Sequence, residues 1–338
     1  RERLQSLHRL AAETIEALYP DDQSQYDALL EHWDEAGVVD KSLYYTIPVC
    51  ERLVGIAADY GRAERLLAQA LAYGVAAQRM TLLRLLGDAA LSRGEYLTAI
   101  THYEACLAAG DDEIEARILA LDGLGKVHTQ QGDYPTAVRF AEQALTLARD
   151  QGNQAGTARA LTTLGDAAFQ QGDYPTAHTH FSEGLRLFRE LASPAGVVGA
   201  LNRLGKIATL KGDKTTARTY LEESLNLARQ MGDRQQLGSI LNNLGNLSLD
   251  QGDSQATRAY YESSLRLRRE IGDRNGVGGS LGNLAILMLR QGKTDEGLAF
   301  TEASLNERRA IGDRKGIANA LALLASIAYD RNDLLTAQ

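Results

Sequence analysis

One motif returns at a regular interval along most of this 338-residue chain. Its clearest marker is a leucine followed by glycine or alanine, which recurs about every 40 residues, a period typical of helical repeat proteins. These leucines are Leu86, Leu124, Leu164, Leu204, Leu244, Leu284 and Leu324. A fixed period of this kind is typical of a solenoid, in which each unit buries its apolar face only against its neighbours. The spacing therefore predicts an elongated array.

Two further positions keep the same register. In six copies a glycine follows the marker leucine at a constant distance. A small residue then follows that glycine at a second constant distance. The glycines are Gly94, Gly132, Gly172, Gly212, Gly252 and Gly292, with Asn332 in the last copy. The small residues are Ala99, Ala137, Ala177, Ala217, Thr257, Gly297 and Ala337. Small residues beside large leucines suit two closely packed helices.

Apolar residues within a unit recur every three or four positions, as in Leu161, Leu164 and Ala168 and then in Ala177 and Phe181. This spacing is helical, and the gap between the two runs predicts two helices per unit.

The residues in that gap have a structural reason for being there. Gly172 can adopt the left-handed conformation that ends a helix, and Asp173 can cap the next one. Pro175 is tolerated in the first turn of a helix. We therefore expect a short turn at residues 171–173.

The combination Leu164-Gly165, Gly172-Asp173-Tyr174, Ala177 and Phe181 resembles the tetratricopeptide repeat (TPR). The common repeat of that family has about 34 residues. The longer period here is similar to the variant in kinesin light chain and in the C-terminal sensor arms of STAND-class signal-transduction ATPases. The resemblance implies an all-α fold, a right-handed α-solenoid of tandem helix-turn-helix repeats. Residues 80–338 would form six full repeats and a truncated seventh.

Residues 1–79 are expected to form a helical region of degenerate TPR-like units that leads into the array. Its first helix would carry an apolar stripe of Leu4, Leu7, Ala11, Ile15 and Leu18. The run from His8 through Gly37 resembles the segment that joins the ATPase module to the repeat arm in STAND-class regulators. At Pro48 we expect a break or kink, because the residue before a proline is pushed out of the helical conformation.

The ends of the chain suggest a fragment of a longer protein. The first residue is not Met, and residues 333–338 would only begin the second helix of the seventh unit. The face formed by Leu321, Leu324, Ala328 and Leu334 would then lack a neighbour.

Composition narrows the range of partners and compartments. A net charge of −8 disfavours nucleic acid or an anionic membrane as the main partner. No apolar run approaches the ~18 residues of a membrane span. Cys50 and Cys106 are far apart in sequence and are predicted to be buried free thiols, which suits a reducing cytoplasm.

No stretch has the pattern of a catalytic, cofactor or metal site. The chain lacks a Gly-x-x-x-x-Gly-Lys-Ser/Thr phosphate loop. His178 and His180 are separated by one residue on a predicted helix, so they point to different sides of it. We therefore predict a protein that is not an enzyme and has neither a cofactor nor a metal.

The TPR resemblance also indicates where a partner would bind, because the first helix of each unit lines the concave groove in that family. The matching positions are Asp122, Gly123 and Lys126; Thr162, Thr163 and Asp166; Asn202, Arg203 and Lys206; Asn242, Asn243 and Asn246; and Gly282, Asn283 and Ile286. The candidate groove residues are Asp122, Lys126, Asp166, Asn202, Arg203, Lys206, Asn242, Asn243, Asn246 and Asn283. Asn side chains can bond an extended peptide backbone and the cations can hold a carboxylate. Alternatively, the Asn residues only cap or solvate helix faces.

Arginines and lysines gather near the ends of the later helices. They are Arg266, Arg268, Arg269, Arg274, Arg308, Arg309, Arg314 and Lys315. Cations at helix C-termini complement the helix dipole and pair with nearby acids, which is the simpler interpretation. A basic ridge for an acidic partner is the alternative.

The sequence thus predicts a non-catalytic scaffold that binds a protein or peptide. The first hypothesis is the ligand-sensing arm of a larger STAND-class regulatory ATPase, with the ATPase module in the same parent chain. The alternatives are a free-standing adaptor that bridges proteins, as kinesin light chain does, or an intracellular receptor for short signalling peptides.

Overall fold

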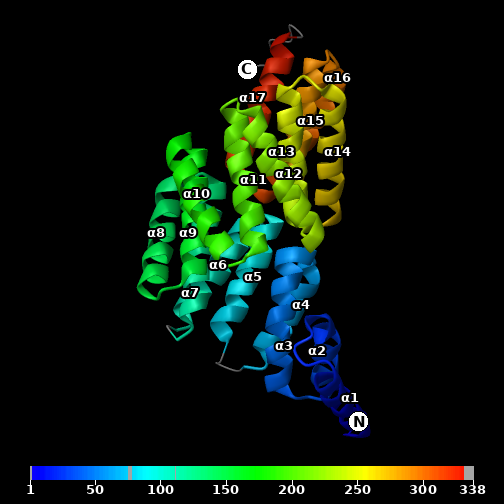
Figure 1. Cartoon of the computed structure of the whole chain (residues 1–338). Helices are drawn as coiled ribbons and strands as arrows, with labels where there is room; N and C mark the ends of the chain where they lie inside the picture. Colours follow the sequence, from blue (N-terminus) through cyan, green and yellow to red (C-terminus); the bar gives the residue numbers. More distant parts are fainter. Residues whose placement is uncertain (1, 75–77, 111, 331–338) are drawn as a thin grey trace.

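The fold is all-α, as the sequence predicts. The computed structural model describes residues 2–74, 78–110 and 112–330, and within these ranges it contains 17 α-helices, most of them packed in consecutive antiparallel pairs (Figure 1). The N-terminal region comprises α1 (Glu2–Leu18), α2 (Tyr26–Glu35), α3 (Val39–Arg52) and α4 (Tyr60–Ala72), with a 3-10 turn η1 (Gln23–Gln25) and a π-helical turn η2 (Leu53–Ala57).

Seven repeat units follow. Their first helices are α5 (Arg79–Arg93), α7 (Ile114–Gln131), α9 (Gln154–Gln170), α11 (Pro194–Leu210), α13 (Arg234–Asp250), α15 (Arg274–Arg290) and α17 (Arg314–Asp330). Their second helices are α6 (Tyr96–Ala108), α8 (Tyr134–Asp150), α10 (Tyr174–Glu190), α12 (Lys214–Met231), α14 (Ser254–Glu270) and α16 (Thr294–Ile311). The expected second helix of the seventh unit, with Asn332, Leu334 and Ala337, lies outside the described residues.

The turn inside the second to fifth units forms as its residues predict, with an aspartate capping the second helix. In the third unit Gly172 has φ +84°, and the Asp173 N–H donates to the Ala168 carbonyl at 3.0 Å, which ends α9. The Asp173 carboxylate then accepts the Thr176 N–H at 3.1 Å and caps α10, with Pro175 in the first turn. Helix start and stop are therefore local consequences of the repeat sequence.

The first helices form the inner layer of the array and the second helices the outer one (Figure 1). Each second helix packs on the first helix of its own unit and on that of the next. The small-residue ladder lies at these contacts, where Ala137, Ala177 and Ala217 are fully buried. At Gly165 the two helices leave no room for a side chain, because an added Cβ would lie 2.5 Å from the Phe181 ring. The α-solenoid is confirmed in its helix pairing and its layers.

The solenoid pattern predicted that each unit contacts only its neighbours. The structure departs from this prediction. The array curls until the later inter-unit turns lie on the beginning of the chain. A Cβ added to Gly94 would lie 3.5 Å from the side chain of Ile311. Lys315 Nζ donates to Gln170 Oε1 at 2.8 Å. Ile271 is buried in the core that also holds helices of the N-terminal region. These contacts join the fifth to seventh units to the first three.

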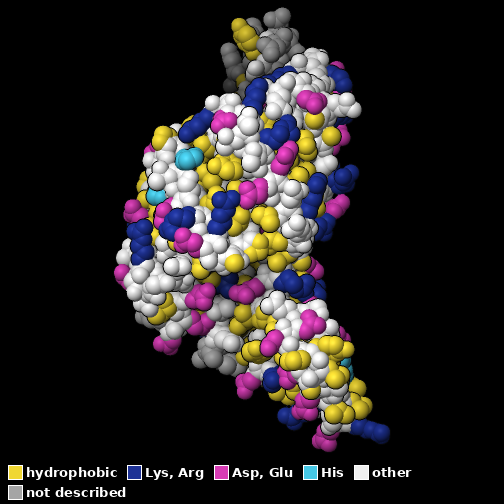
Figure 2. All heavy atoms as spheres, viewed as in Figure 1, with side chains coloured by type: hydrophobic (Ala, Val, Ile, Leu, Met, Phe, Trp, Pro, Cys, Tyr) yellow, Lys and Arg dark blue, Asp and Glu magenta, His cyan; other side chains and the backbone are white. Residues whose placement is uncertain are grey.

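The N-terminal region departs from expectation in two ways. Most of the stripe on α1 is not covered, since Leu4, Leu7 and Leu18 are all more than half exposed, although Ile15 packs against the core. Apolar side chains show on this end of the molecule in Figure 2. Instead α1 contacts its neighbours through buried Ala12 and through Glu16, whose carboxylate accepts bonds from Trp33, Tyr45 and Lys41.

Of the break or kink expected at Pro48, the break is wrong, and a kink stays a prediction. Helix α3 continues through Pro48 to Arg52 and ends in the π-helical turn η2, after which Ala58 is left-handed at φ +55°. A proline forfeits one backbone donor but does not by itself terminate a helix whose faces are packed, and residues Val49 and Cys50 beside it are buried.

Both cysteines are free and buried, as predicted. Burial raises the pKa of the Cys50 thiol to about 12 and that of Cys106 to about 11, so both stay protonated at neutral pH. Across the described ranges, no helix combines the length and apolarity that crossing a bilayer requires.

Candidate functional site

The predicted groove residues meet across neighbouring inner helices. Between α7 and α9, the Thr163 hydroxyl donates to Asp122 Oδ1 at 2.6 Å. The other oxygen of the same carboxylate pairs with Lys126 Nζ at 2.6 Å. Asp122 is 1% exposed, and its charge is therefore satisfied inside the array rather than offered to a partner.

Between α9 and α11 the link is an ion pair. Arg203 donates from Nε and Nη2 to the two oxygens of Asp166 at 2.8–3.0 Å, a forked geometry that strengthens the bond. The ammonium of Lys206 lies 4.1 Å from the centre of the Phe169 ring. Burial lowers the pKa of Lys206, an effect that the Asp166 carboxylate opposes.

Asparagines connect the next three inner helices. Asn243 Nδ2 donates to Asn202 Oδ1 at 2.8 Å, which joins α13 to α11. Asn283 Nδ2 donates to Asn242 Oδ1 at 3.0 Å and to Asn246 Oδ1 at 3.3 Å, which joins α15 to α13. These bonds and the two links above form a polar ladder, defined here as the ten candidate groove residues with Thr163.

The ladder leaves several donors unused. Asn242, Asn246 and Lys206 are half-buried on the inner face, and their Nδ2 and Nζ atoms have no acceptor among the described residues. The oxygen of Asn246 is already shared, since it also accepts the Tyr261 hydroxyl at 2.7 Å. The unused donors of Asn242, Asn246 and Lys206 can bind the carbonyl or carboxylate oxygens of a ligand.

The structure sorts the remaining groove positions by exposure. Thr163 and Gly123 are buried in helix packing, and Asn202 is 6% exposed, so a partner would not reach them directly. Ile286 is exposed on α15. The Asn residues do not simply face solvent, because one polar atom of each bonds another asparagine across helices.

A set of residues that the sequence analysis missed controls how far apart the inner helices lie. Ala148, Phe188, Ala228, Arg268 and Arg308 occupy the same place in successive repeats, near the end of each second helix. We call the contact between first helices of successive units a joint, and these five the joint residues. Their regular spacing and changing size were visible in the sequence, but only the structure shows that they point between two inner helices.

Joints differ according to this residue. At Ala148 and Ala228 the inner helices α7 and α9, and α11 and α13, touch along much of their length. At Phe188 the helices α9 and α11 hardly touch, and at Arg268 and Arg308 contact is sparse. Interaxial distance depends on the side chains at the contact, which explains the difference.

The basic-ridge alternative is wrong for two of its members. Arg268 is 8% exposed and the Arg308 side chain 17%, because both are joint residues. Arg274 is paired with Glu307 at 3.2 Å. On the face shown in Figure 2 the two signs of charge are interspersed. Three of the eight cations, Arg268, Arg274 and Arg308, pair with nearby acids, as the simpler interpretation predicted for them.

Within the described ranges, no group of three or more His, Cys, Asp or Glu side chains is placed to hold a metal ion. His178 lies 3.5 Å from Ser182 Oγ on the outer helix α10 and not beside His180.

Comparison with known proteins places this arrangement in a family. Residues 53–334 match the sequence profile of the MalT-like TPR region. None of the curated protein sequences is detectably similar to the chain.

Several solved structures share the fold. A Rap protein complexed with Competence and Sporulation Factor superposes with a TM-score of 0.62 at 13% identity, over 100% of both chains. NprR in complex with its cognate peptide NprX gives 0.60 at 14% identity, over 84% of this chain and 83% of that one. A STAND protein with a tetratricopeptide repeat sensor from Pyrococcus horikoshii gives 0.54 at 14% identity, over 92% of this chain but only 44% of that one.

Proposed function

Because this chain belongs to the MalT-like TPR family, we propose that it is a non-catalytic scaffold whose inner face binds an extended peptide or protein segment. The observation that carries the proposal is the set of unused donors on adjoining inner helices, Asn242 Nδ2, Asn246 Nδ2 and Lys206 Nζ. The backbone of an extended peptide presents a carbonyl oxygen at every residue, and each can accept one of these donors.

The polar ladder gives this binding its geometry. Bonds between Asn283 and the Asn242 and Asn246 oxygens fix both amides, so their N–H groups are held in place before a ligand arrives. Preorganised donors lose little conformational freedom on binding. Each new hydrogen bond is worth about 0.5–1.5 kcal/mol net, and more where the acceptor is charged.

The test replaces the donors and keeps the ladder. In the double variant Asn242→Asp with Asn246→Asp, an oxygen takes the place of each free Nδ2, while the other oxygen still accepts Asn283 and Tyr261. Partners are captured from the native host and their affinity is measured by titration. We expect affinity to fall by about tenfold or more, since about 1.4 kcal/mol corresponds to a factor of ten.

A matched control carries the same chemical change on the outer helices. Asn226 and Asn306 are exposed on α12 and α16, so Asn226→Asp with Asn306→Asp adds the same charge away from the inner face. This control should bind within twofold of the unaltered chain. Unchanged affinity in the inner-face variant, with an unchanged circular dichroism spectrum, would move the binding site elsewhere.

At a finer level we propose that the scaffold is the ligand-sensing arm of a STAND-class regulator in the cytoplasm, with the ATPase module in the same parent chain. The likeness to a STAND protein with a TPR sensor supports this proposal through the shared fold. An intracellular receptor for short signalling peptides is the second candidate, favoured by the likeness to NprR, which was solved with its cognate peptide. A free-standing adaptor is the third.

These finer candidates differ in what binding does. For a sensor arm, the captured ligand should change the ATPase rate of the native polypeptide that carries this chain. If that polypeptide contains no phosphate loop and hydrolyses no ATP, the sensor-arm proposal fails and the peptide receptor or adaptor takes its place.

A further inference from the structure

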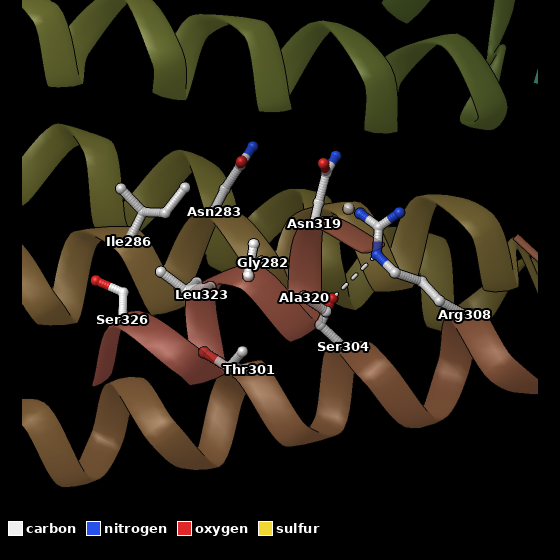
Figure 3. Close-up of a pocket in the computed structure, with 12 residues that line it drawn as sticks. Gly282, Asn283, Ile286, Thr301, Ser304, Arg308, Asn319, Ala320, Leu323 and Ser326 are labelled. Atoms are coloured by element: carbon white, nitrogen blue, oxygen red, sulfur yellow. Dashed lines mark hydrogen bonds between the residues drawn. The ribbon is translucent and has the colours of Figure 1, made fainter. Parts of the chain in front are cut away.

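A cavity of about 400 Å³ opens between α15, α16 and α17, beyond the end of the polar ladder (Figure 3). Arg308 lies at one end and Ile286 near the other, with Asn283 and Asn319 between them. In Figure 3 the two asparagine side chains point the same way and the Arg308 guanidinium lies beside Asn319. The volume is in the range of small-molecule or side-chain pockets.

Arg268 is the residue equivalent to Arg308 one repeat earlier, and its bonds show how the corresponding space is filled there. Its guanidinium donates from Nη1 to the Gly276 carbonyl at 2.8 Å and to Ser280 Oγ at 3.0 Å. Its Nη2 donates to Ser239 Oγ at 3.3 Å. Two serine hydroxyls therefore hold the arginine and fill the space around it.

Both hydroxyls are missing in the next repeat. Gly279 stands at the place of Ser239, and Ala320 at the place of Ser280. These two residues line the cavity together with Arg308. The cavity thus lies where the sequence has lost the two groups that seal the preceding joint.

The loss also leaves a donor of Arg308 unused. Its Nε donates to Ser304 Oγ at 3.1 Å and its Nη1 to Asp313 Oδ2 at 2.6 Å, but Nη2 has no acceptor among the described residues. The side chain of Asn319 is exposed and likewise has no described partner. Both groups border the same cavity.

Charge at the site favours an anionic acceptor. A guanidinium is permanently positive, and no acidic residue of the described ranges lines the cavity. The nearest carboxylate, Asp313, is shared between Arg308 and the Gly316 N–H that it caps at 2.8 Å. The N-terminal end of α17 adds a partial positive charge beside it.

We propose that this cavity binds a carboxylate of the peptide that occupies the inner face. Arg308 Nη2 and Asn319 Nδ2 donate to its oxygens, and Ile286 and Leu323 contact the side chain next to it. The inference rests on the proposed function and extends it, because it fixes which end or residue of the ligand lies at the last units. The carboxylate belongs either to the chain end of the ligand or to an Asp or Glu side chain.

Small probes test the site without knowledge of the natural ligand. The probes are N-acetylleucine, its amide N-acetylleucinamide, and N-acetylaspartic acid 1-amide, which carries only a side-chain carboxylate. Side-chain amide signals of Asn319 and Asn283 and the Nε–H signal of Arg308 are followed by NMR. We expect a saturable shift with at least one acid and affinity at least tenfold weaker for N-acetylleucinamide. Which acid binds more tightly identifies the source of the carboxylate.

The decisive variant restores the missing hydroxyls and leaves Arg308 untouched. Gly279→Ser has room, because the atom nearest to an added Cβ is Arg268 Nη1 at 3.8 Å. Gly279→Ser with Ala320→Ser should therefore fold, satisfy Arg308 and reduce binding of the acid probe at least tenfold. In the control Asn226→Asp with Asn306→Asp, probe binding should stay within twofold.

The inference is overturned if acid and amide probes bind alike or if the serine variant binds the acid as tightly as the unaltered chain. Its failure is separable from failure of the proposed function. A partner that is sensitive to Asn242→Asp with Asn246→Asp but indifferent to the serine variant would leave inner-face binding intact and exclude the carboxylate site alone.

Discussion

Two joints next to each other in the array, at Ala148 and at Phe188, show how one side chain changes a repeat structure. At the first, α7 and α9 lie against each other and Thr163 bonds Asp122 directly. At the second, Phe188 fills the space between α9 and α11, and the long side chains of Arg203 and Lys206 cross the wider inner face. The repeat period is the same on both sides, and the wider joint is the one whose joint residue is large.

The width of a joint also decides what the inner face can offer to a ligand. A narrow joint brings short polar side chains together, which satisfies them within the fold. At the wide Phe188 joint the longer, charged side chain of Arg203 reaches across to Asp166, whereas at the Arg268 joint Asn283 still bonds Asn242. The proposed peptide-binding donors and the carboxylate cavity both lie from the Phe188 joint onward, where three of the four joint residues are large.

Of the changes at the wide joint, removal of the Phe188 side chain should have the largest effect on stability. The side chain is 6% exposed, so Phe188→Ala leaves a cavity and is expected to cost about 3–5 kcal/mol. Hydrogen exchange of α9, α10 and α11 measures the loss locally, since a repeat array need not unfold as one unit. Leu210→Ala, at a 54% exposed position on α11, is the control and should cost less than about 0.5 kcal/mol. A cost for Phe188→Ala no larger than that of the control would show that the residue does not hold this joint open.

Breaking the ion pair that crosses the same joint should have an intermediate effect. Asp166→Asn weakens the forked bond to Arg203, and we expect a loss of about 1–3 kcal/mol because Arg203 then keeps an under-satisfied, partly buried charge. A double-mutant cycle with Arg203→Gln isolates the interaction energy.

The exposed pair Arg186 and Glu190 on α10 provides the comparison for this cycle, because both side chains are about half exposed and the coupling should be below about 0.5 kcal/mol. Equal coupling energies for the two pairs would mean that the wide joint gives its ion pair no special role.

The smallest expected effect concerns the turn that precedes α11. Other inter-unit turns place Gly152, Gly232, Gly272 or Gly312 in the left-handed conformation, whereas this turn places Ala192 there at φ +49°. A side chain in this conformation costs roughly 1–2 kcal/mol, so Ala192→Gly should stabilise the local fold by about 1 kcal/mol. Hydrogen exchange would measure this gain. The joint should stay wide by small-angle X-ray scattering, and a more compact array would show that the turn and not Phe188 sets its width.

The sequence by itself determined the features whose causes lie within one repeat. The repeat period, the helical spacing from Leu161 to Phe181, and the turn residues Gly172 and Asp173 act over short distances. They are sufficient to predict an all-α array of helix pairs, and the resemblance to the TPR family adds which positions line its inner face. The burial of Cys106, at a small-residue position of its unit, follows from the same pattern.

Tertiary structure alone decided the features that depend on the sum of many units. Small rotations between successive units add up along the array, so the contact between Ile311 and Gly94 cannot be read from either sequence neighbourhood. The joint residues are a second example. Their spacing is visible in the sequence, but only the structure shows that their side chains point between two inner helices. A third example is α1, since the amphipathic pattern shows that Leu4 and Leu7 share a face but not whether another element covers that face.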